Sequence, residues 1–396
     1  MGKRYEVSDE WINEAMAAAE GNLALAAKYI NENFSPASKV TRQNLQTWIN
    51  DDENAFAQDS MDNAELSRKA RLQQNNNNAL RREIRNLTDA VNTRDSVLQT
   101  IAQSVVALPT PYMPVFCKPT PNGRPITVEL LFSDLQVGKL MSDYDSKVAR
   151  KRVDEWIAVV LDRLSQYETL GYKIEKIVLA VLGDIIESDK KHNNSGRACD
   201  IGTADQMKLG MEMLRDVVFR LEHCAPKMDV VMITGNHDHD DHGLNMFMPG
   251  REHLSWPMYH AVKELFANYD HINFFIPEGS FHVHQIYGQN VLYEHGVGVA
   301  TSQAAMKKHV GNRIDQLKQY IALFRMGDKH NICRFNNDRY VVNGAFFGDS
   351  RHGEEYSGIA GYDGEPAQLM FAHVKRADNF RTSLFDSLAV QLGHVK

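Results

Sequence analysis

Five apolar, strand-like runs between residues 126 and 326 each end in side chains that bind metal ions or carry protons. Helical stretches at 153–170 and 206–221 lie between the runs, and this alternation predicts an α/β fold with buried strands. The polar endings are Asp134 with Gln136, Asp184, Asn236-His237-Asp238, His295, and Asp328 with His330. Because ligands bind beyond the carboxyl ends of strands in open α/β sheets, we expect these endings to meet in one site.

Each ending taken alone has a simpler explanation. A single Gly-Asp or Gly-Asn pair is usually turn chemistry, and a single histidine beside a strand is usually a packed or surface residue. The five endings follow one another as Asp, Gly-Asp, Gly-Asn-His-Asp, His-Gly and Gly-x-x-His. That order is specific enough to favour a metal site.

The same order of motifs, over roughly residues 126–350, resembles the calcineurin-like metallophosphoesterase superfamily. The resemblance implies a four-layer α/β/β/α sandwich, two divalent metal ions and hydrolysis of a phosphate ester. It extends to phosphoesterases encoded by bacteriophages, whose segment after the last metal motif is similar to residues 342–371 of this chain. That segment contains Tyr356 and is expected to border the substrate cleft.

The resemblance also implies which residues hold the two metals. Asp134, Asp184 and His330 would hold the first, and Asp184, Asn236, His295 and Asp328 the second. Gln136 and Asp328 stand where the family usually has histidine. Oxygen-rich sites favour Mn²⁺ or Mg²⁺ over softer metals, so we expect Mn²⁺, with Mg²⁺, Fe²⁺ and Zn²⁺ as alternatives. The two departures also leave open a partly decayed site.

His237 matches the family's catalytic histidine, and imidazole suits the task because it can protonate a leaving oxygen. Asp238 either orients that imidazole or caps the loop. His192 and Arg197 follow the second motif on an expected loop over the site, where Arg197 would clamp a phosphate. For both residues a solvated loop position is the simpler interpretation.

Residues 1–60 predict a small all-α module. Helices are expected at 8–19, at 23–34 and from Thr41 onward, with Gly21 as a breaker. Three short helices with a tight turn before the third suggest a helix-turn-helix module, and the segment resembles those of bacterial regulators. However, the module holds five Lys and Arg against ten Asp and Glu, whereas a phosphate-binding surface should be basic. A helical bundle for protein contacts is the alternative.

Residues 61–108 predict a long helix. Apolar residues recur three and four positions apart from 80 to 105, which is typical of a coiled coil, and burying that seam predicts a homodimer. A helix packed on its own catalytic domain is the alternative. Six basic residues in its N-terminal half form a stripe that would suit a nucleic-acid backbone, or simply be solvated. Prolines in 109–125 then predict a stiff linker to a catalytic domain at 126–396.

Composition narrows the environment of the protein. Among 396 residues the net charge is −7, and the sequence contains no apolar run of membrane-spanning length, so we expect no membrane contact. Four scattered cysteines indicate reduced thiols in a cytoplasm, the host's if the chain is phage-encoded.

Three functions fit these observations. The first is a dinuclear-metal-dependent nuclease or phosphodiesterase acting on nucleic acid. The second is a phosphatase or phosphodiesterase for a small nucleotide or phosphoprotein. The net charge of −7 fits this function slightly better than it fits nucleic-acid binding. The third is a non-catalytic DNA- or protein-binding scaffold with a structural metal site, motivated by Gln136 and Asp328.

Overall fold

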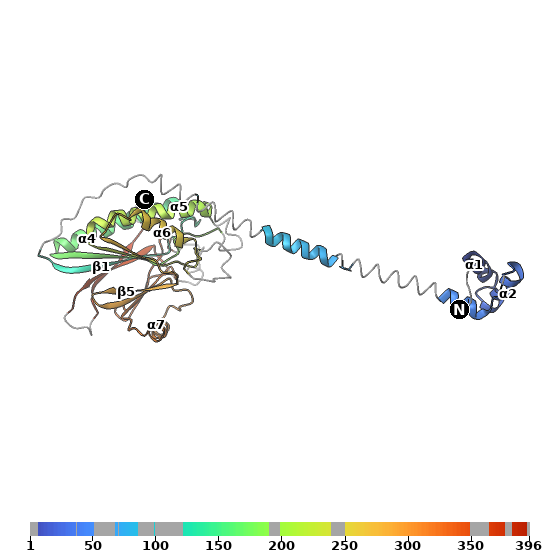
Figure 1. Cartoon of the computed structure of the whole chain (residues 1–396). Helices are drawn as coiled ribbons and strands as arrows, with labels where there is room; N and C mark the ends of the chain where they lie inside the picture. The colour runs from blue at the N-terminus through green and yellow to red at the C-terminus, as the bar shows by residue number, and fades with distance from the viewer. Residues whose placement is uncertain are drawn as a thin grey trace. The chain divides into compact units, whose positions relative to one another are not determined.

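The chain divides into two compact units, Met1–Asp89 and Ala90–Lys396, each treated separately below (Figure 1). The computed structural model describes residues 7–36, 38–50, 68–69, 71–85, 99, 122–189, 199–238, 250–348, 364–376 and 382–393. The predicted linker at 109–125 lies largely outside the described residues. None of the described helices is both long enough and apolar enough to cross a lipid bilayer.

The first unit contains the predicted helices. Helix α1 (Asp9–Ala18) starts after Ser8, whose hydroxyl accepts from the Trp11 amide, and α2 (Leu23–Asn33) starts after Asn22. A third helix covers 42–50, where the Thr41 hydroxyl accepts from the Asn44 amide at 3.2 Å. Side-chain oxygens at these positions satisfy amides that the first turn leaves unpaired.

The end of α2 and the start of the third helix agree with the prediction to within one residue. Residues 34–41 separate the two helices, whereas a helix-turn-helix turn takes about three or four residues. Asn31 holds this connection, because its side chain donates to the Val40 carbonyl at 2.7 Å and accepts from the Val40 amide at 2.9 Å. The helix-turn-helix module therefore stays a prediction.

A further helical stretch covers 71–85. Leu80 and Ile84, at seam positions of the predicted coiled coil, are 55% and 62% exposed. The remaining seam positions lie outside the described residues, so the coiled coil stays a prediction.

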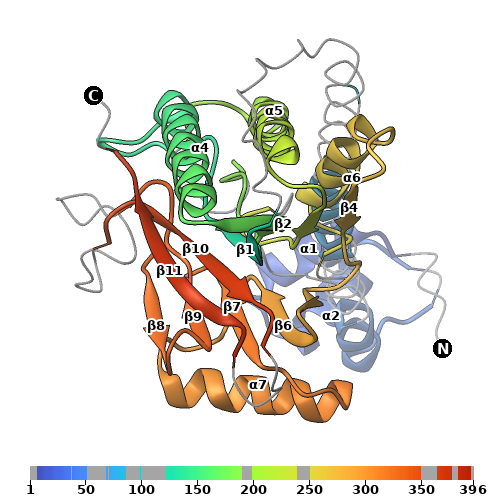
Figure 2. The ribbon, with the colours of Figure 1, turned by 90° about the vertical axis from the view of Figure 1, so that its left-hand side faces the viewer.

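The second unit is built on two β-sheets (Figure 2). The six-stranded sheet has the order β11 (Leu384–Gln391), β10 (Ala367–Val374), β1 (Arg124–Phe132), β2 (Tyr172–Val181), β3 (Met228–Met232) and β4 (Ile272–Phe275). The five-stranded sheet has the order β5 (Phe281–Ile286), β6 (Gln289–Glu294), β7 (Leu323–Met326), β9 (Tyr340–Val342) and β8 (Cys333–Phe335). Strands β1 to β4 are mutually parallel, as are β6, β7 and β9.

Helices cover the outer faces of both sheets (Figure 2). Helices α4 (Ser146–Thr169), α5 (Thr203–Leu221) and α6 (Ser255–Leu265) pack on the six-stranded sheet, with the short helix η3 (Glu222–Cys224) after α5. Helix α7 (Gln303–Leu317) packs on the five-stranded sheet. A separate apolar cluster joins the two sheets, so the predicted four-layer α/β/β/α sandwich is confirmed.

Strand β1 shows why its sequence specifies this central place. Successive side chains of a strand point to opposite faces. Leu130 and Phe132 face the core under the helices, whereas Leu131 faces the other sheet. The carboxyl ends of β1, β2, β3, β6 and β7 precede the five polar endings, so the fold brings those endings to one edge of the sandwich.

Candidate metal site

Three of the predicted ligands form a compact buried cluster. Ligand atoms of Asp134, Asp184 and His330 all lie within 4.8 Å of one another, although the residues follow three different strands. Nε2 of His330 is 3.6 Å from Oδ1 of Asp134 and 3.3 Å from Nε2 of Gln136. The structure therefore places Gln136 beside the first predicted metal position.

Oxygen atoms in this cluster lack hydrogen-bond donors. Oδ2 of Asp134 and Oε1 of Gln136 are buried without a hydrogen bond from any described residue. An unsatisfied buried polar atom costs about 1–3 kcal/mol, and more when it is charged. A divalent cation satisfies such oxygens at once, so the donor set fits a metal ion.

His295 is the centre of a second group. Its Nδ1 donates to the Leu182 carbonyl at 2.7 Å, and in the neutral ring this tautomer leaves the Nε2 lone pair available. Around Nε2 lie Oδ1 of Asn236 at 2.8 Å, Oδ2 of Asp184 at 3.1 Å and Oδ1 of Asp328 at 3.6 Å. Four electron-pair donors thus converge, and Asp184 belongs to both groups, as expected of a bridging ligand.

The backbone is strained where it carries these ligands. Positive φ values in the left-handed region occur at Asp134 (53°), Gln136 (43°), Asp184 (54°), Asp328 (67°) and His330 (59°). Residues other than glycine are uncommon there, and such strain persists only where the surrounding structure enforces it. Five of the thirteen described non-glycine residues with positive φ are thus predicted ligands, so their loops are held in tight conformations by the surrounding fold.

The protein groups alone show strong electrostatic coupling. Burial and the Asp184 charge raise the pKa of Asp134 to about 6, against the opposing effect of two histidines. Burial lowers the pKa of His295, but Asp184 and the other nearby carboxylates outweigh it and raise that pKa to about 10. Burial raises the pKa of Asp184, but the neighbouring His295 and His237 outweigh burial and bring that pKa well below its ordinary value. The site therefore concentrates negative charge that attracts a cation.

His237 lies beside the cluster and is held by a carboxylate that the sequence analysis did not single out. Oε2 of Glu187 is 3.1 Å from Nδ1 of His237, and Oδ2 of Asp184 is 4.0 Å from its Nε2. The backbone amide of His237 also donates to Oδ1 of Asp184 at 2.8 Å. Lys139 Nζ lies 3.7 Å from Glu187 and balances its charge.

Asp238 contacts backbone instead of the imidazole. Its carboxylate accepts from the amides of Gly235 at 2.7 Å and Ile185 at 3.1 Å, and from the Ser255 hydroxyl at 2.8 Å. Of the two roles considered for Asp238, these contacts support the cap. The aspartate joins the loop after β3 to the loop after β2.

Three predicted substrate residues, His192, Arg197 and Tyr356, lie outside the described residues. Part of the glycine-rich segment 342–371 is described, and its last residues belong to β10, which is buried along its whole length. Those residues form the core of the six-stranded sheet, so the expectation of a cleft border is wrong for them.

Comparisons with known proteins found distant structural likenesses only. No protein-family model and no curated protein matches the sequence. Among solved structures, zinc-complexed Vps29 from Entamoeba histolytica aligns with 67% of this chain and 99% of its own, at 10% identity and a TM-score of 0.28. A predicted phosphoesterase from Streptococcus pneumoniae aligns over 68% and 94%, at 9% identity and a TM-score of 0.28. A putative 5'-nucleotidase from Staphylococcus aureus aligns over 67% and 54%, at 9% identity and a TM-score of 0.30. Likenesses at this level do not establish a shared activity.

Proposed function

We propose that this protein is a metal-dependent phosphoesterase that hydrolyses phosphodiester bonds, with nucleic acid as its substrate. The observation that carries the proposal is the convergence of two ligand groups on the shared carboxylate of Asp184, next to the imidazole of His237. Two ligand groups that share one carboxylate are the arrangement used to hold a pair of divalent ions for in-line displacement at phosphorus.

The donor set assigns residues to each ion. Asp134, Asp184, Gln136 and His330 would hold one, and Asp184, Asn236, His295 and Asp328 the other. Oxygen predominates among these ligands, so Mn²⁺ is the expected metal, with Mg²⁺, Fe²⁺ and Zn²⁺ as alternatives. When bound, such ions supply Lewis acidity that lowers the pKa of water and neutralises charge on phosphoryl oxygens.

The protein itself contributes position and a proton. Hydrolysis forms a bond from water oxygen to phosphorus, breaks the bond from phosphorus to the leaving oxygen, and releases a proton of the attacking water to solvent. The leaving oxygen needs a proton, and Nε2 of His237 is the donor beside the shared carboxylate. Glu187 holds the opposite ring nitrogen, so it keeps the imidazole protonated and correctly oriented.

The test is turnover of bis(4-nitrophenyl) phosphate and 4-nitrophenyl phosphate with added Mn²⁺, followed by labelled single- and double-stranded DNA. Turnover of the diester and of DNA supports the proposal. Turnover confined to monoesters or free nucleotides favours the small-substrate phosphatase that the net charge of −7 fits. Metal binding with no turnover favours the scaffold that Gln136 and Asp328 suggest.

The N-terminal module is proposed to contact nucleic acid through its third helix. The exposed side chains there include Arg42, Gln43, Gln46, Thr47 and Asn50, none of them acidic. Amide, hydroxyl and guanidinium groups on one helix are suited to base edges and phosphates. Salt-dependent binding of a DNA duplex that weakens in Arg42→Ala supports this; unchanged binding favours a protein partner.

We also propose that residues 80–105 pair with a second copy of the chain. The exposure of Leu80 and Ile84 leaves apolar surface on the described part of that helix. Light scattering of the full chain should give a dimer mass, and Ile84→Glu should shift it toward the monomer. A monomer at all concentrations contradicts the pairing.

A further inference from the structure

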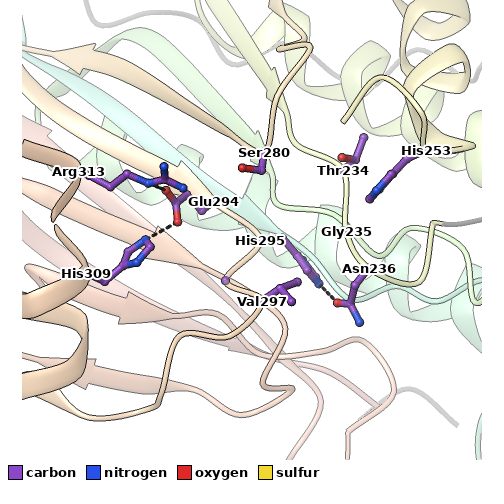
Figure 3. Close-up of a pocket in the computed structure, with 11 residues that line it drawn as sticks. Thr234, Gly235, Asn236, His253, Ser280, Glu294, His295, Val297, His309 and Arg313 are labelled. Carbon is purple, nitrogen blue, oxygen red and sulfur yellow. Dashed lines mark hydrogen bonds and ion pairs between the residues drawn. The ribbon is translucent and has the colours of Figure 1, made fainter. Parts of the chain in front are cut away.

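A cavity of about 230 Å³ opens directly beside the second ligand group (Figure 3). Its walls come from the loop after β3, the segment before α6, the turn before β5, the end of β6 and helix α7. The lining residues are Thr234, Gly235, Asn236, His253, Ser280, Glu294, His295, Gly296, Val297, His309 and Arg313. Asn236 and His295 are predicted metal ligands, so the cavity and the candidate metal site share a wall.

The wall contributed by α7 presents a fixed guanidinium. Nε of Arg313 lies 2.6 Å from Oε1 of Glu294, and its guanidinium stacks over Phe281 at 4.3 Å. His309 Nε2 holds the other Glu294 oxygen at 2.6 Å (Figure 3). Nη2 of Arg313 makes no hydrogen bond within the described residues, so it remains a positioned donor.

A further polar group on the opposite wall lacks a partner. The Thr234 hydroxyl is buried and makes no hydrogen bond within the described part of the chain. Val297 adds apolar surface. The combination of apolar wall and a few fixed polar groups is characteristic of a small-molecule site.

Cavity size limits what fits. Sites for complete drug-sized ligands occupy about 300–1,000 Å³. A cavity of about 230 Å³ is smaller and suits one substituent of a ligand whose remainder lies outside.

The position of His237 indicates which substituent of the substrate the cavity binds. The lining includes Asn236 and His295 but not His237, the proposed proton donor to the leaving oxygen. A group seated in the cavity is therefore not the leaving group. Resting on the proposed function, we infer that the cavity binds the retained ester arm of a phosphodiester, an arm that carries a hydrogen-bond acceptor for Arg313. A phosphate monoester has only a leaving arm, so the cavity selects diesters.

The experiment fills the cavity with Val297→Phe in the full-length protein. Val297 lines the cavity and is 52% exposed, so a phenylalanine there narrows the cavity without disturbing the core. The matched control is Val159→Phe, on the outer face of α4 and 37% exposed. The values compared are kcat/KM with Mn²⁺ for bis(4-nitrophenyl) phosphate and for 4-nitrophenyl phosphate.

We expect Val297→Phe to lower kcat/KM for the diester about tenfold or more and for the monoester by less than about twofold. A second readout does not use turnover. In a His237→Ala background, adding Val297→Phe should weaken calorimetric binding of the diester about tenfold and leave inorganic phosphate binding unchanged. Val159→Phe should change neither readout.

The outcomes separate the two proposals. Equal losses for both esters, or an unchanged diester rate, overturn the cavity assignment and leave the phosphodiesterase proposal standing. Wild-type turnover of the monoester alone overturns both. No turnover of either ester by metal-loaded wild-type protein overturns the phosphoesterase proposal and this inference with it.

Discussion

Oε2 of Glu187 lies 3.1 Å from Nδ1 of His237, so a carboxylate from the loop after β2 orients an imidazole from the loop after β3. Burial lowers the pKa of His237, but Glu187 and Asp184 outweigh it, and the net shift is upward. The protonated ring therefore persists to a higher pH than in free histidine. That is the state that a proton donor requires.

Glu187→Gln should move the basic limb of the pH–rate profile to lower pH. The amide keeps a polar contact but removes the charge that raises the pKa of His237, so the ring loses its proton earlier as pH rises. The measurement is kcat against pH with Mn²⁺, alongside metal content. Glu278→Gln, at a surface carboxylate, is the control. An unmoved basic limb contradicts the proposed role of Glu187.

His237→Ala should lower turnover by about 10²–10⁴-fold, the usual contribution of a positioned acid or base. Metal content, measured by atomic emission, should stay unchanged because neither ligand group includes the His237 side chain. His282→Ala, at a histidine of β5, is the control and should keep both values. A parallel loss of metal would move His237 into the ligand set.

Gln136→His should tighten metal binding. Oε1 of Gln136 is buried without a hydrogen bond from any described residue, and its amide nitrogen lies 3.3 Å from Nε2 of His330. Imidazole at this place is a stronger ligand than a neutral amide. Calorimetry with Mn²⁺ should give a lower Kd than wild type. Weaker binding would show that Gln136 does not face the first metal.

Sequence reasoning located the candidate site because its ligands follow continuous apolar strands. Parallel strands buried on both faces leave that signature, and the ligands sit at a fixed place relative to it. Glu187 had a weaker signal. It stands three residues after Asp184, and only the folded loop shows that it meets His237.

Strand β10 was overlooked because its polar residues have distant partners. Gln368 donates to the Ser133 carbonyl at 3.1 Å, and Nε2 of His373 lies 2.9 Å from Glu129. Buried Gln and His within an apolar run weaken the strand pattern unless those partners are known. The apolar run at 340–347 forms a strand only as far as Val342, and the Asn343 side chain that follows joins Ser133 and Gln368 in the same network.

Helix α7 was also overlooked. Among its residues only Met306 and Val310 are buried, too few for a clear helical period. Packing of those two side chains against the five-stranded sheet, and not local propensity, places the helix. Arg313 therefore gave no signal in the sequence, although it lines the cavity.

Gly235→Ala should abolish metal binding. A Cβ atom at Gly235 would lie 2.0 Å from Oδ1 of Asp184 and 2.3 Å from the Asp184 amide nitrogen. The protein can relieve this clash only by moving the Asp184 backbone and, with it, the shared carboxylate. Gly311→Ala on α7 is the matched control, since its Cβ meets nothing and alanine favours helix by up to about 1 kcal/mol. Calorimetry with Mn²⁺ separates the two. Full binding by Gly235→Ala contradicts the tight approach of the two loops.

Glu129→Gln should destabilise the second unit through a charge network between the sheets. Glu129, Arg325 and His373 are all completely buried, with Arg325 Nε 3.1 Å and His373 Nε2 2.9 Å from the carboxylate. Removing the charge leaves two basic groups without their partner, at a cost of about 3–5 kcal/mol. Glu278→Gln, whose surface partner Arg251 is 3.9 Å away, should change the free energy of unfolding by less than about 0.5 kcal/mol.

The effect of Glu129 depends on pH with a defined sign. Burial raises its pKa, but Arg325 and His373 outweigh burial and lower it from 4.5 to about 2. A carboxyl whose pKa is depressed by folding stabilises the protein above its unfolded pKa and loses that contribution as pH falls toward the folded one. The difference in unfolding free energy between wild type and Glu129→Gln, measured with urea, should therefore be constant from pH 7 to 5 and shrink from about pH 4.5 to about pH 2. A difference that stays constant down to pH 2.5 would mean that the Glu129 pKa is not set by this network.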